Sequence, residues 1–217
     1  MHHTSMRSRI IALLAPLALA ASTSAQGGPM NQVDFRNDMR KLWEDHITWT
    51  RLYIVSTAAN LPDKEATTQR LLRNQTDIGD AIKPFYGNAA GDKLTTLLKD
   101  HITTAAELIG AAKAGDAAKK DAASKRWFAN ADEIATFLSG ANPRQWRLAE
   151  MKGMLHDHLA LTTDEVVAQL KQDWPGSIGA YDKVHEQMLK MADALSLGII
   201  RQHPNRFRGS AVAARTQ

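Results

Sequence analysis

The sequence Leu42-Trp-Glu-Asp-His-Ile-Thr-Trp-Thr-Arg51 contains the motif from which the fold can be predicted. Its Asp-His pair returns twice in similar surroundings, as Leu97-Leu-Lys-Asp-His-Ile-Thr-Thr104 and as Met154-Leu-His-Asp-His-Leu-Ala-Leu-Thr162. The three histidines are His46, His101 and His158, which lie 55 and 57 residues apart. This spacing predicts tandem helical hairpins that carry a polar layer in their core.

Glycine and proline occur where a helical pattern of apolar residues stops, and few segments alternate as strands do. We expect helices at residues 31–59, 63–84, 89–114, 117–139, 143–173 and 177–201. Asn142-Pro143 has the residues of a helix start, and Gly115-Asp116 suits a stop followed by a new cap. Because short connections favour antiparallel neighbours, the predicted fold is all-α: a six-helix bundle of three antiparallel hairpins with a quasi-repeat of about 56 residues.

Two asparagines support the repeat. Asn74 in the second helix matches Asn130 in the fourth, 56 residues later, and each precedes an acid and an isoleucine at the same spacing. Helical period places both asparagines and the three histidines on stripes of apolar residues, so all five should face the core. Residue counts from the turns then place His46 opposite Asn74, and His101 opposite Asn130.

The third hairpin follows the pattern more loosely. Residue counts from its turn place His185 opposite Glu165, and His158 opposite Met191. Buried imidazole and carboxamide groups must be hydrogen-bonded, so the layer either satisfies itself or holds a ligand or water. Its candidate ligand-binding residues are Asn74, Asn130, Trp43 and Thr50, and its candidate metal ligands are His46, His101, His158, His185 and Glu165.

Imidazole and carboxylate groups suit Zn, Fe, Cu or Mn, but their spacing here does not select one metal. Four methionines near the third hairpin's histidines form a soft set that suits copper(I), or alternatively fill gaps in the core. They are Met151, Met154, Met188 and Met191. The sequence thus predicts a binding protein for a metal or small polar ligand, or alternatively a structural module whose polar layer sets helix register.

The sequence gives little support for an enzymatic function. The chain has neither the Glu-x-x-His motif of di-iron bundles nor the His-Glu-x-x-His motif of zinc proteases. Glycine-rich phosphate loops and Gly-x-Ser-x-Gly elbows are also missing from the sequence. Its net charge of only +4 argues against nucleic-acid binding, which requires a concentrated basic face.

Both ends of the chain differ in composition from the rest. Arg7 and Arg9 precede an apolar run of about a dozen residues and then small residues up to Ala25, as in a secretory signal peptide. Residues 1–25 are therefore expected to be cleaved, leaving a periplasmic or secreted domain at 26–202 without stable membrane insertion. We expect the basic residues 203–217 to form a flexible tail. The absence of cysteine excludes disulfides and thiolate metal sites.

Three stretches also carry a family resemblance: the opening one, Asn74-Gln-Thr-Asp-Ile-Gly-Asp-Ala-Ile-Lys-Pro84 and Met191-Ala-Asp-Ala-Leu195. They resemble a family of small bacterial all-helical proteins of unassigned function, and the likeness covers nearly all of the chain after the signal peptide. The resemblance implies an all-helical fold. Members carry labels such as glycosyltransferase or acetylglutamate kinase, activities expected on α/β frames with nucleotide loops, whereas these residues predict helices.

Overall fold

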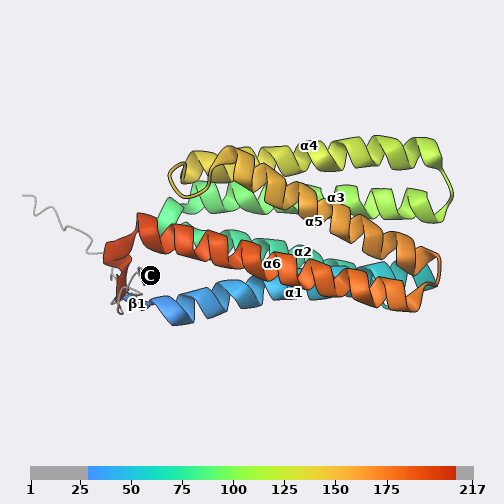
Figure 1. The fold of residues 1–217 in the computed structure, drawn as a ribbon, viewed down its shortest axis with the longest axis horizontal. Helices are drawn as coiled ribbons and strands as arrows, with labels where there is room; N and C mark the ends of the chain where they lie inside the picture. The colour runs from blue at the N-terminus through green and yellow to red at the C-terminus, as the bar shows by residue number, and fades with distance from the viewer. Residues whose placement is uncertain (1–28, 209–217) are drawn as a thin grey trace, which may run out of the picture.

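The computed structural model describes residues 29–208, which fold into six long helices. These are α1 (Gln32–Ala59), α2 (Lys64–Tyr86), α3 (Asn88–Lys113), α4 (Ala117–Ala141), α5 (Leu148–Leu170) and α6 (Trp174–Gln202). A 3₁₀ turn, η1 (Pro204–Arg206), and two short strands, β1 (Met30–Asn31) and β2 (Phe207–Arg208), complete the described part. The prediction of an all-α fold with antiparallel hairpins is confirmed (Figure 1).

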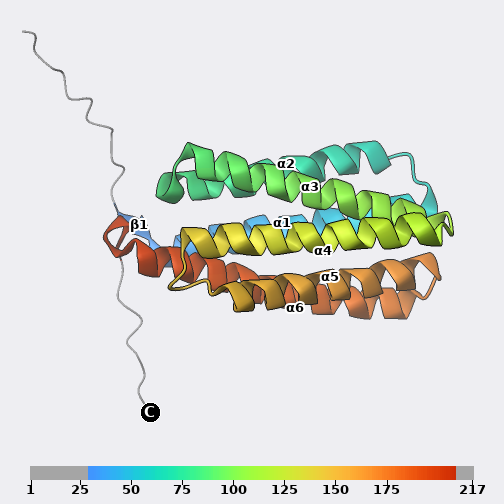
Figure 2. The same ribbon diagram turned by 90° about the horizontal axis from the view of Figure 1, so that it is seen from above.

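The six helices run along the long axis of the molecule, and each packs against its neighbour in sequence. The last helix, α6, returns beside α1, so that the order of the helices closes into a ring (Figures 1 and 2). Apolar stripes of all six helices therefore meet on a common axis. No helix among residues 29–208 is long and apolar enough to cross a membrane.

Several helix ends follow from local chemistry. Gly115 has φ +70°, and the Asp116 side chain then accepts a hydrogen bond from the Lys119 backbone N–H at 3.0 Å, as the sequence predicts. The N-terminal cap of α1 is Asn31, whose Oδ1 accepts from the backbone N–H of Val33 at 2.7 Å. These caps satisfy backbone groups that a helix leaves unpaired at its ends.

The start of α5 differs from the expectation. The helix begins at Leu148 instead of residue 143, because residues 143–147 form a turn that drives Trp146 into the core. The Asn142 carbonyl accepts the backbone N–H of Trp146 at 2.8 Å, and its side-chain Nδ2 donates to the Gly198 carbonyl at 2.9 Å. The asparagine thus ends α4 and holds the turn that follows it, instead of capping the start of α5.

The first part of the expected C-terminal tail is packed. β2 pairs in parallel with β1, and the Phe207 ring stacks on Phe85 with centroids 5.6 Å apart. Phe207 is buried because it is the one aromatic side chain in an otherwise basic run, and Phe35 and Phe85 offer it an apolar surface. The signal peptide expected at 1–25 and the tail residues after 208 lie outside the described residues.

Two glycines allow α2 and α3 to approach closely. A Cβ added at Gly79 would lie 2.0 Å from Thr95 Oγ1 and 2.6 Å from the backbone oxygen of Gly91. We expect Gly79→Ala to lower the free energy of unfolding by about 1–3 kcal/mol, because the helices must move apart. Urea unfolding measures the change.

The matched control for that substitution is Gly110→Ala in the last turn of α3, where an added Cβ meets no atom within 4 Å. It should stabilise the protein by up to about 1 kcal/mol through helix propensity alone. Equal effects of Gly79→Ala and Gly110→Ala would contradict a close helix crossing at Gly79.

Candidate functional site

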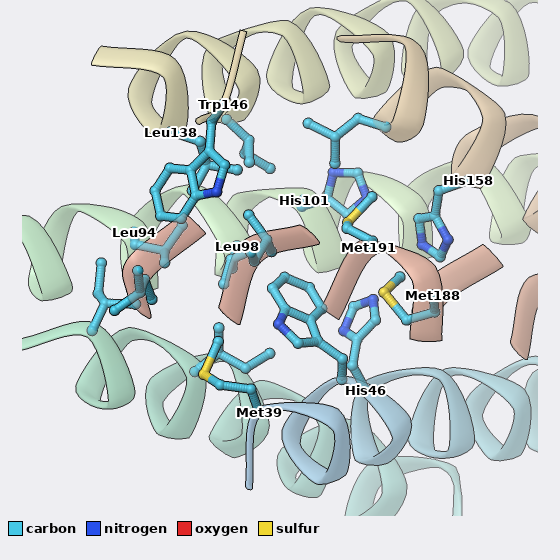
Figure 3. Close-up of a pocket in the computed structure, with 17 residues that line it drawn as sticks. Met39, His46, Leu94, Leu98, His101, Leu138, Trp146, His158, Met188 and Met191 are labelled. Atoms are coloured by element: carbon cyan, nitrogen blue, oxygen red, sulfur yellow. The ribbon is translucent and has the colours of Figure 1, made fainter. Parts of the chain in front are cut away.

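The histidines that open the three hairpins turn inward and meet on the bundle axis. His46 of α1, His101 of α3 and His158 of α5 are only 3%, 4% and 4% exposed. Figure 3 shows the three rings around one shared space, and the centroids of His46 and His158 lie 5.8 Å apart. Alternate helices of the ring therefore contribute one imidazole each to a common layer, called the histidine layer below.

In the second hairpin a carboxamide holds the imidazole. His101 Nδ1 lies 2.8 Å from Asn130 Oδ1, and Asn130 Nδ2 donates to the carbonyl of Leu97 at 3.1 Å. Because the amide nitrogen is used on Leu97, the oxygen faces the ring and accepts a hydrogen bond from Nδ1–H. This arrangement leaves Nε2 of His101 with a free lone pair, and it confirms the expected pairing of these two residues.

The third hairpin repeats the arrangement with a glutamine. Gln187 follows His158 by 29 residues, as Asn130 follows His101, and its Nε2 donates to the Met154 carbonyl at 2.8 Å. His158 Nδ1 and Gln187 Oε1 are both buried without a hydrogen-bond partner, although the two side chains adjoin. A small rotation of either side chain would let His158 Nδ1–H donate to Gln187 Oε1. His158 Nε2 would then keep its lone pair free.

In the first hairpin, one carboxamide bonds the backbone carbonyl and a second one contacts the imidazole. Asn74 Nδ2 donates to the Leu42 carbonyl at 3.0 Å, as Asn130 does to Leu97. The neighbour of His46 Nδ1, at 3.3 Å, is Gln75 Nε2, which also donates to the Leu71 carbonyl. The expected pairing of His46 with Asn74 is therefore wrong by one residue. The Asn74 side chain already donates to the Leu42 carbonyl and accepts from Gln75 Nε2.

Sequence reasoning missed Gln75 and Gln187. Each lies 29 residues after its histidine, the interval that also separates His101 from Asn130. That interval was the signal that could have found both, since hairpins of equal length place residues at equal intervals opposite each other. Met191 lines the same cavity as His158, as expected.

His185 and Glu165 do not belong to the histidine layer, and the expected pairing between them is wrong. The half-buried His185 places its Nε2 2.9 Å from the Glu44 carboxylate at the surface. Glu165 is 1% exposed and accepts from Arg51 Nη1 at 3.0 Å, beside the hydroxyl of Ser177. Burial raises the pKa of Glu165, and the Arg51 guanidinium opposes that rise.

Two enclosed cavities flank the histidine layer, with volumes of about 30 and 20 Å³. All three histidines line both cavities, and the other walls are mostly apolar. Trp43 lines the first cavity, while Thr50, whose hydroxyl donates to the His46 carbonyl at 2.8 Å, lines the second. Each cavity has room for one or two water molecules.

Some polar atoms around these cavities have no partner. Trp43 Nε1 at the first cavity, and Trp127 Nε1 and Thr162 Oγ1 at the second, are buried without a hydrogen bond. Each such atom costs about 1–3 kcal/mol unless something in the cavity satisfies it. The region therefore offers unused donors beside the imidazoles.

The imidazoles are held neutral. Burial lowers the pKa of His46 to about 3, with a further contribution from His101, and burial lowers the pKa of His101 to about 4. Burial, followed by the nearby His46 and His101, also lowers the pKa of His158 well below its usual value. All three rings are thus uncharged at pH 7, and they offer no positive charge to an anionic ligand.

Glu165, the one carboxylate that the sequence suggested as a metal ligand, lines neither cavity. Within residues 29–208 there is no group of three or more His, Cys, Asp or Glu side chains arranged to hold a metal ion. Hard divalent cations prefer oxygen ligands, and no carboxylate lines either cavity. The histidine layer therefore does not suit magnesium- or calcium-type chemistry.

No family model, curated protein or solved structure matches this chain. The resemblance to a family of small bacterial helical proteins stays a prediction from sequence. Arguments about function consequently depend on the geometry of the histidine layer and its two cavities.

Proposed function

We propose that this chain is an exported binding protein whose histidine layer holds a transition-metal ion or a small uncharged polar molecule. The supporting observation is the set of unpaired buried atoms, Trp43 Nε1, Trp127 Nε1 and Thr162 Oγ1, beside three neutral imidazoles and two enclosed cavities. A small polar molecule, or a water bound to a metal ion, offsets the desolvation cost of these N–H and O–H groups by accepting hydrogen bonds from them, while the imidazole lone pairs are the atoms that can bind the metal ion itself. Export is proposed from the signal-like composition of residues 1–25 alone.

The test uses the untagged, naturally exported protein. Native mass spectrometry and elemental analysis should detect a bound species, and His46→Ala or His101→Ala should lose it. Two half-exposed histidines give matched controls: His156→Ala and His185→Ala remove imidazoles that pair with surface carboxylates. Protein whose mass equals the bare chain, and whose thermal unfolding is insensitive to Zn, Cu, Fe and Mn, would rule out the binding function.

A structural module is the second candidate, and the His101–Asn130 pair favours it. That pair satisfies the Nδ1–H of His101 and the carboxamide of Asn130, and the same interval recurs in all three hairpins, as expected of a device that fixes helix register. In this case Asn130→Ala lowers stability by about 1–3 kcal/mol for each group left unpaired, without changing any ligand affinity. Combined measurement of unfolding and ligand retention separates the two candidates.

A further inference from the structure

Two imidazoles and two thioethers meet at the first cavity, the one of about 30 Å³. His46 and His158 line it together with Met188 and Met191, and all four side chains are at most 4% exposed. Figure 3 shows the Met188 side chain projecting into the space near the His46 and His158 rings. The donor atoms available there are neutral nitrogen and neutral sulfur.

The distance between the rings fits a shared ion. With metal–nitrogen bonds of about 2.0–2.1 Å, two imidazoles bound through Nε2 to one ion have centroids roughly 5–6.5 Å apart, depending on the bond angle. The measured separation of His46 and His158 is 5.8 Å. A sulfur ligand from Met188 would complete a three-coordinate site.

The charge of the metal ion and the softness of the available ligands favour one kind of ion. A divalent cation here would keep an uncompensated double charge in an apolar enclosure, because no carboxylate lines the cavity. Copper(I) carries a single charge and prefers imidazole and thioether ligands. The Trp43 ring also lines the cavity, 5.8 Å from His46, and its π face can stabilise a cation.

We propose that the first cavity is a copper(I) site, with His46, His158 and Met188 as ligands and Trp43 beside the ion. This deepens the proposed binding function and rests on it. Copper(I) enters as the monovalent ion, so no oxidant or reductant takes part.

The carboxamides orient the ligands in this site. A histidine that binds metal commonly donates its other ring N–H to an oxygen acceptor, which fixes its tautomer. Gln187 Oε1 adjoins His158 Nδ1 and has no other partner, so it is placed for that task. At His46 the same arrangement requires the Gln75 carboxamide to turn over, so that its unpaired Oε1 faces Nδ1. This change gives up the hydrogen bonds of Gln75 Nε2 to the Leu71 carbonyl and to Asn74 Oδ1.

Competition with bicinchoninate under anaerobic, reducing conditions tests the proposal on the full untagged chain. One copper(I) per chain should resist the competitor, and His46→Ala or His158→Ala should lower the affinity at least about 100-fold, since each removes a ligand. Met188→Leu, which keeps side-chain size, should lower it about 10-fold. X-ray absorption should show sulfur together with nitrogen around the metal.

The controls alter the same two residue types, methionine and histidine, at positions that do not line the cavity. Met154→Leu alters a methionine that does not line it, and His185→Ala alters a surface histidine; neither should change the affinity. His2 and His3 lie in the expected signal peptide, and in protein that retains this segment they are common to every variant and cancel in the comparison. Affinity unchanged by His46→Ala and His158→Ala would overturn the copper site.

The outcome also separates this proposal from the broader one. A chain that yields all copper(I) to the competitor, but retains a small neutral molecule in native mass spectrometry, overturns the copper site alone. A chain that retains neither overturns both the copper site and the binding function.

Discussion

Acidification from pH 7 to about pH 4 should unfold the protein cooperatively. The unfolded chain takes up protons on His46, His101 and His158 once the pH falls below about 6.5. In the folded chain, burial lowers the pKa of His46 to about 3 and that of His101 to about 4, and it lowers the pKa of His158 well below its usual value. A folded-state pKa below the unfolded value makes stability fall as the pH falls through this window. Three such groups give a slope of about 4 kcal/mol per pH unit, which consumes a typical total stability within a few units.

Urea unfolding at a series of pH values measures that slope. His101→Gln removes one titrating group and retains a polar side chain, so the slope should drop by about a third whatever its effect on stability at pH 7. Gly110→Ala, which removes no titrating group, should leave the slope unchanged. Glu165 acts in the opposite direction, since its raised pKa favours the folded state in acid, but it is a single group. Stability independent of pH between 6 and 4 would refute this account.

Trp146→Ala should give the largest loss of stability among single core substitutions, about 3–5 kcal/mol. Its indole is 2% exposed, lines the first cavity and donates from Nε1 to the Ala194 carbonyl at 3.3 Å. Removal of the ring enlarges that cavity and leaves the Asn142–Arg147 turn without its anchor. The loss appears as a lower urea midpoint.

A second tryptophan provides the matched control. Trp174 at the start of α6 is 52% exposed, so Trp174→Ala removes the same side chain without opening the core. Its effect should stay within about 0.5 kcal/mol. Similar losses from both substitutions would show that Trp146 does not fill the end of the bundle.

Much of the histidine layer could be predicted from helical period. His46, His101, His158, Asn74 and Asn130 all face the core, because the 3.6-residue period fixes which side of a helix each residue occupies. Pairings that depended on distance along the axis were less secure: that of His101 with Asn130 is confirmed, whereas that of His46 with Asn74 is wrong by one residue. One residue changes the direction of a side chain by about 100° and its height by about 1.5 Å, so counts from uncertain turns cannot separate Asn74 from Gln75.

The failure at His185 and Glu165 has a different cause. Both are placed by contacts with α1, a helix far away in sequence: Glu44 takes the imidazole and Arg51 takes the carboxylate. No pattern within the third hairpin contains that information. The ring closure between α6 and α1 is needed to bring these partners together.

Six helices, their antiparallel order and the inward direction of three histidines could be predicted from the chain alone, because caps, turns and apolar period are local properties. Packing between the helices sets which carboxamide meets each imidazole, places Trp146 in the core, and leaves cavities on both sides of the histidine layer. Those features depend on how far each helix slides and rotates against its neighbours, and only the packed bundle fixes that.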